Sequence, residues 1–76
     1  MLYSFDGNII TAKSSDEVIS RLKETTSSDD IDDKLFMLYM SDSFEVDYGV
    51  EIDYKNSKMF VDECIKYGII HIVQMH

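Results

Sequence analysis

The stretch SDDIDDKLFMLYMSDSFEVDYGVEIDY, residues 28–54, decides the fold, because it combines the longest predicted helix with the clearest predicted strand. Ser28 followed by Asp29 and Asp30 predicts a helix start, since acidic residues in a first turn complement the helix dipole. Apolar residues then recur at helical spacing. The sequence therefore predicts a helix from about 29 to 47.

The end of this stretch predicts a helix stop and a strand. Gly49 suits the left-handed conformation that commonly closes a helix. Val50, Ile52 and Tyr54 alternate with acidic residues, which is typical of a strand that is buried on one face. A strand over 50–54 is therefore expected.

The residues before this stretch predict a hairpin and a short helix. Residues 2–5 and 9–12 are rich in aromatic and β-branched side chains, and an Asp-Gly-Asn turn separates them. Ser14 precedes Glu17 by three residues, which is a capping-box spacing. Apolar residues at helical spacing follow, so a helix over 15–25 is expected.

The residues after this stretch predict a third helix and a last strand. Asn56 or Ser57 caps a helix over 58–67, and a glycine ends it. Residues 69–73 are apolar on both faces, which predicts a central strand. The expected fold class is α+β, in one domain spanning residues 1–76: a four-stranded, mostly antiparallel sheet with about three helices, in the order β-β-α-α-β-α-β.

The net charge is concentrated in one third of the chain. Residues 28–53 hold nine acidic residues and one base, Lys34, whereas the other residues hold six of each sign, so the whole net charge of −8 is local. A local negative field favours a basic protein surface as the partner. Nucleic acid and anionic membranes are disfavoured as direct ligands, because both require Lys or Arg side chains to neutralise phosphate.

The predicted middle helix is apolar on two sides when it is plotted at about 100° per residue. One stripe, formed by Ile31, Leu35 and Leu38, fits an ordinary core face. The second arc contains Phe36, Met37, Met40 and Phe44. Three explanations of this second arc remain open: the helix over 15–25 covers it, a partner or a second copy covers it, or the phase of the helix differs from the plot.

The interface explanation defines a candidate protein-binding site, in which apolar anchors are flanked by acids. Charges would speed and orient the encounter, and apolar contacts would hold it. The predicted site consists of Asp29, Asp32, Asp33, Phe36, Met40, Asp42, Phe44, Glu45 and Asp47.

The functional hypothesis is a small acidic, non-enzymatic module that binds another protein. By analogy of size and charge, it fits an inhibitor from a phage or mobile element that occupies the nucleic-acid channel of a basic host protein, as DNA mimics and anti-CRISPR proteins do. The alternative is a homodimeric structural or regulatory module without nucleic-acid mimicry, in which the apolar arc forms the interface.

No enzyme, metal site or cofactor is predicted. Cys64 falls on the apolar side of a predicted helix and is interpreted as a buried hydrophobe rather than a nucleophile paired with His71. The acidic run 29–33 does not match a calcium-binding loop, because Lys34 interrupts the ligand positions and the required glycine is missing. A single cysteine, no signal peptide and no long apolar run predict a cytoplasmic protein.

Overall fold

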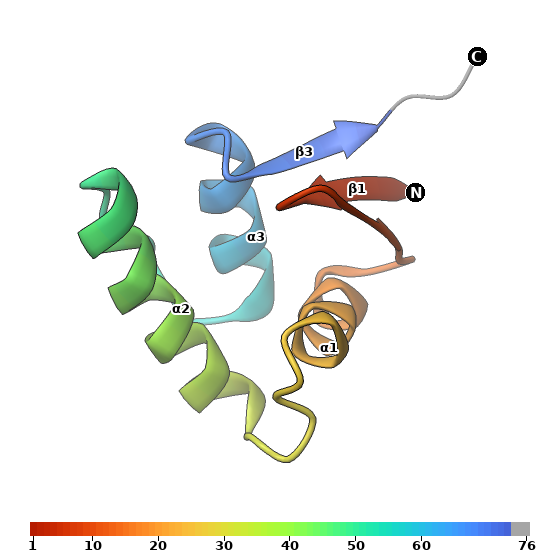
Figure 1. Cartoon of the computed structure of the whole chain (residues 1–76), viewed down its shortest axis with the longest axis horizontal. Helices are drawn as coiled ribbons and strands as arrows, with labels where there is room; N and C mark the ends of the chain where they lie inside the picture. The colour runs from red at the N-terminus through yellow and green to blue at the C-terminus, as the bar shows by residue number, and fades with distance from the viewer. Residues whose placement is uncertain (74–76) are drawn as a thin grey trace.

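The computed structural model describes residues 1–73. Its elements are β1 (Leu2–Phe5), β2 (Asn8–Thr11), α1 (Ser15–Thr25), α2 (Asp33–Tyr48), α3 (Ser57–Lys66) and β3 (Ile70–Val73), as shown in Figure 1. Their order, β-β-α-α-α-β, forms one α+β domain with three helices and a three-stranded antiparallel sheet. The predicted fold class is confirmed, but the predicted fourth strand is wrong for the described residues.

The N-terminal hairpin forms as predicted. β1 and β2 pair in antiparallel fashion and are joined by Asp6 and Gly7, whose φ angles are 49° and 81°. Positive φ at both central residues of a two-residue loop is the type I′ geometry that matches the twist of the flanking strands. Gly7 adopts this conformation without the steric cost that a side chain would carry.

The sheet has the strand order β2-β1-β3, so β1 is the central strand and β3 is at an edge. This corrects the prediction that residues 69–73 form a central strand. Ile70 is buried, but His71 and Ile72 are exposed. The apolar residues of this run are therefore buried only at the start of the strand, and the strand is not covered on both faces.

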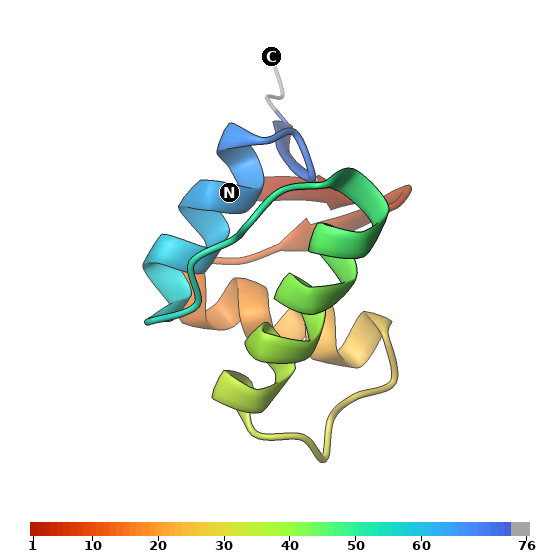
Figure 2. The ribbon, with the colours of Figure 1, turned by 90° about the vertical axis from the view of Figure 1, so that its left-hand side faces the viewer.

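The predicted strand over 50–54 is absent because no neighbouring strand pairs with it. Its alternation holds only in part: Ile52 is buried and Glu51 is exposed, but Tyr54, which was expected on the buried face, is 39% exposed. Side chains take the place of a ladder, since the Ser41 hydroxyl donates to the Ile52 carbonyl (2.8 Å) and the Asp53 N–H donates to Glu63 Oε1 (3.0 Å). These bonds satisfy backbone groups that a sheet would otherwise pair. Figure 2 shows the segment running from α2 to α3.

α2 begins four residues later than the prediction of residue 29. α1 ends in a Schellman motif, in which Ser27 takes a φ of 58° and the Ser28 N–H donates to the Lys23 carbonyl (2.7 Å). The following turn uses the residues up to Ile31, so Asp32 becomes the N-cap residue. Asp33, rather than Asp29 and Asp30, is the acid in the first turn.

The core lies between the helices and one face of the sheet. Residues opposite each other in a ladder share a face, so Phe5, Ile10 and Ile70 all point towards the helices. α1 packs against β2 and α3, α3 packs against β3, and α2 packs against α1. Leu22 of α1 and Phe60 of α3 are fully buried where these elements meet. α2 therefore lies at one side of the molecule (Figure 1).

Candidate protein-binding surface

The acidic third of the chain covers one side of the fold. Residues 29–53, here called the acidic layer, comprise the loop before α2, α2 itself and the start of the segment that leads to α3. Lys34 is their one basic residue. The exposed acids of the layer are Asp29, Asp30, Asp32, Asp42, Glu45, Asp47 and Glu51. The predicted charge asymmetry is thus a property of one side of the folded molecule.

Asp33 differs from the other predicted acids because it already has a partner. Its Oδ1 accepts a hydrogen bond from the Lys23 ammonium at 2.8 Å, and both side chains are partly buried. This ion pair links α1 to the first turn of α2. Asp33 therefore contributes less free negative charge to a partner than Asp32 or Asp42.

The predicted aromatic anchors belong to the core. Phe36 and Phe44 are only 2% and 4% exposed. The Phe44 ring centroid lies 6.1 Å from that of Phe5 and 6.3 Å from that of Phe60, so strand and helix side chains surround it. Met40 is partly buried against the same cluster. Their placement as exposed anchors is therefore corrected: the interior of this chain covers the second arc of α2.

A different set of apolar side chains faces outward from α2. Leu35, Tyr39 and Val46 are 40%, 53% and 84% exposed, and Asp42 lies between them on the same face. We call these four residues the α2 strip. Their i, i+4, i+7, i+11 spacing places them on one side of a helix. That spacing is readable in the sequence, but the prediction assigned Leu35 to the core.

A hollow runs beside the α2 strip. It has a volume of about 290 Å³ and is lined by Asp32, Lys34, Leu35, Leu38 and Tyr54. Aliphatic and aromatic groups form most of its lining, together with the Asp32 carboxylate. It offers a place for an apolar side chain next to a carboxylate.

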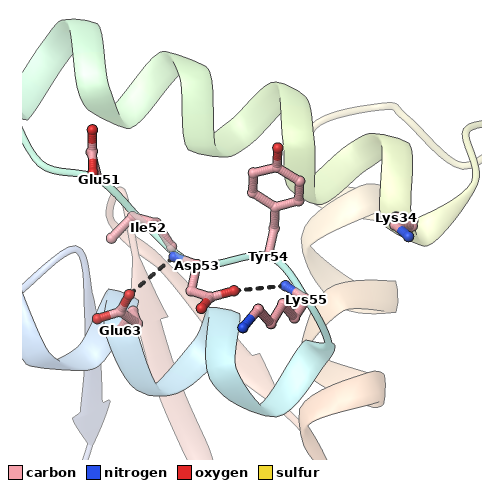
Figure 3. A pocket seen from close by; sticks show the side chains of 7 residues that line it. All are labelled: Lys34, Glu51, Ile52, Asp53, Tyr54, Lys55 and Glu63. Atoms are coloured by element: carbon pink, nitrogen blue, oxygen red, sulfur yellow. Dashed lines mark hydrogen bonds between the residues drawn. The ribbon is translucent and has the colours of Figure 1, made fainter.

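A second hollow, of about 550 Å³, lies between α2 and α3 and shares Lys34 and Tyr54 with the first. Glu51, Asp53 and Glu63 contribute carboxylates, while Lys34 and Lys55 contribute two ammonium groups (Figure 3). Hydrogen bonds fix this hollow: Asp53 donates its N–H to Glu63 and accepts the Lys55 N–H at 2.9 Å. Tyr54 lies between these bonded residues and points towards α2 (Figure 3).

The one cysteine lies in the core. Cys64 is fully buried, and this burial raises the pKa of its thiol from 9.0 to about 12. A thiol with this pKa carries almost no thiolate at neutral pH, so it is a poor nucleophile. Across residues 1–73, no group of three or more His, Cys, Asp or Glu side chains is placed to hold a metal ion.

Within the same residues, none of the helices has the length and apolar character needed to cross a membrane. Comparisons with protein-family models, with curated proteins and with solved structures found no match. The fold and its surface together define a small acidic α+β domain with an outward-facing apolar strip.

Proposed function

We propose that this chain is a non-enzymatic module that binds a basic protein surface through the acidic layer and the α2 strip. The observation that supports the proposal is the combination of nine acids with one base on a single side of the fold, next to exposed Leu35, Tyr39 and Val46. Each feature alone is common on protein surfaces. Their coincidence on one side of the fold is suited to binding.

The two features have separate physical roles. The acids attract and orient a positively charged partner over a distance set by ionic strength. Once the surfaces meet, the α2 strip and the hollows around Tyr54 exclude water from apolar groups of the partner. The carboxylates of Asp32 and Glu51, which line the two hollows, favour Lys or Arg side chains there. This division predicts an association rate that falls with salt.

In its more specific form, we propose that the partner is a nucleic-acid-binding protein of the host of a phage or mobile element. A surface that binds phosphate carries Lys and Arg, and an acidic layer competes for the same side chains. DNA mimics and anti-CRISPR proteins act in this way, and the resemblance is one of size and charge. Action in the cytoplasm is part of this proposal, and the free thiol of Cys64 is compatible with it.

The test is displacement of DNA from a basic protein. A fluorescent duplex is bound to purified linker histone, the chain is added, and anisotropy is followed at increasing salt. We expect release of the duplex at low salt and weaker competition as salt rises, because exposed charges are screened. Competition that is indifferent to salt would contradict the electrostatic part of the proposal.

Matched variants separate a specific surface from net charge. The double variant D42N/E45Q removes two charges from α2, and D6N/D16N removes two exposed acids outside the acidic layer. We expect the first to weaken competition about tenfold, equivalent to 1.4 kcal/mol, and the second to change it less than about twofold. Equal effects of the two variants would show that only total charge matters.

A further inference from the structure

The sheet is free of ionised side chains of the common kinds. Its three strands hold four residues each, and none of these is Asp, Glu, Lys or Arg. The whole chain has fifteen acidic and seven basic residues. The strands are therefore a neutral part of a strongly negative molecule. Two copies can approach each other there without repulsion between like charges on the strands.

The two edges of this sheet differ in their protection. Exposed edge strands present unpaired N–H and C=O groups, and natural proteins guard them with charged side chains, prolines, bulges or covering elements. β2 is guarded, because a hollow along it is bordered by Lys13, Glu17, Arg21 and Glu24. These side chains belong to α1 and to the residue stretch just before it.

β3 has none of these protections among the described residues. Its sequence, Ile-His-Ile-Val, contains no charge of the Asp, Glu, Lys or Arg type and no proline. It pairs with β1 on one side, and no described strand pairs with its other side. Ile72 is 42% exposed although its face of the sheet points to the core. An apolar edge of this kind is a template for another strand.

We propose that two copies of this chain associate by antiparallel pairing of their β3 strands. A second copy supplies a strand of the same length and the same uncharged character, and a twofold axis makes the contact self-complementary. Residues opposite each other would share a face, so the six strands would form one sheet with all helices on one face. The hypothesis from the sequence placed a dimer interface on α2, whereas β3 is the neutral surface.

This contact is small, which sets its strength. Four residues per strand bury less than the roughly 1,200 Å² of standard stable interfaces, so the dimer should dissociate on dilution. Sedimentation equilibrium over roughly 1 μM to 1 mM covers the range expected for a weak interface. The wild-type chain should change from monomer to dimer in this range. A monomer throughout, or species larger than a dimer, would overturn the proposal.

Two matched lysine substitutions locate the interface. I72K places a charge on the β3 edge of each copy and should weaken dimerisation at least tenfold. I9K places the same charge on β2, where Ile9 is 62% exposed, and should change it less than about twofold. Far-UV circular dichroism confirms that each variant folds, and H71K on the exposed His71 replaces I72K if the latter does not.

Other results with these variants would place the dimer contact elsewhere on the molecule. Equal weakening by I72K and I9K would show that the contact is not specific to the β3 edge, and loss of the dimer in Y39D would place it on α2; either result overturns pairing through β3. Sedimentation uses no basic partner, so the result is independent of the proposed binding function.

Discussion

Ser41 shows how one polar residue on a helix can belong to the interior. It is buried, and its hydroxyl donates a 2.8 Å hydrogen bond to the equally buried Ile52 carbonyl. The bond connects α2 to the segment that was predicted as a strand and thereby helps to hold that segment without a sheet.

The first prediction concerns this bond. S41A should lower the free energy of unfolding by about 1–3 kcal/mol, because the Ile52 carbonyl would stay buried without a partner. S43A is the control, since Ser43 is exposed on the same helix and should change stability by less than about 0.5 kcal/mol. Urea denaturation monitored by circular dichroism measures both. Equal stability of the two variants would contradict the role of Ser41.

Cys64 predicts a pH dependence of stability. Its pKa is raised to about 12 by burial, whereas the unfolded chain should ionise the thiol near 9.0. Between these values the unfolded state binds fewer protons than the folded state, so the free energy of unfolding falls as pH rises. The contribution is at most about 1.4 kcal/mol per pH unit.

The measurement compares urea unfolding of the wild type and C64A between pH 8 and pH 11. Tyrosines and lysines titrate in both proteins, so the difference between the two profiles reports Cys64. We expect the stability of the wild type to fall more steeply than that of C64A. Parallel profiles would show that the thiol is not held in its protonated form by the fold.

At the scale of elements, α2 has two apolar faces, and the side chains available on neighbouring elements decide which of the two faces is buried. Phe44 packs against Phe5 of β1 and Phe60 of α3, and Phe36 is buried in the same core. Leu35 and Tyr39 are left outside. The helix also starts at Asp33, which leaves Ile31 in the preceding loop and removes the first member of the stripe that was predicted to be buried.

The phase of α2 is testable by mutation. F36A should cost about 3–5 kcal/mol of stability, as is usual for a buried phenylalanine, whereas L35A should cost less than about 1 kcal/mol. The milder variant F36L serves if F36A does not fold, since the larger loss approaches the total stability of many small domains. Urea unfolding provides the comparison. A larger loss for L35A would restore the phase that the sequence suggested.

At the scale of the whole molecule, charge and packing are segregated. The acidic layer lies on one side, the strands carry no Asp, Glu, Lys or Arg, and the remaining charges are balanced. The molecule measures 35 × 27 × 20 Å, so at about 0.01 M ionic strength the screening length of about 30 Å spans most of it. Repulsion within the acidic layer then opposes folding.

This repulsion predicts a stabilising effect of salt. Raising sodium chloride from about 0.01 M to 0.15 M shortens the screening length to about 8 Å and should raise the free energy of unfolding by up to about 1 kcal/mol. Urea is the denaturant, because it is uncharged. D42N/E45Q should show a smaller rise. A decrease with salt would indicate that ion pairs such as Lys23–Asp33 outweigh the repulsion.

Local chemistry allowed much of this fold to be predicted from the chain. The hairpin follows from Asp6-Gly7, and α1 begins where Ser14 accepts the Glu17 N–H at 3.2 Å. α3 begins at its Asn56 cap in the same way. In each case, interactions within a few residues determine the element, so a sequence pattern is sufficient.

The sequence by itself therefore determined the class of fold, most element positions and the concentration of negative charge in residues 28–53. Only the tertiary structure decided which face of α2 is buried, that residues 50–54 lack a strand partner and that β3 lies at an edge. Those features depend on which distant residues compete for the same space. The periodicity of a sequence shows which side chains of a helix or strand are apolar, but it does not show which other residues cover those side chains.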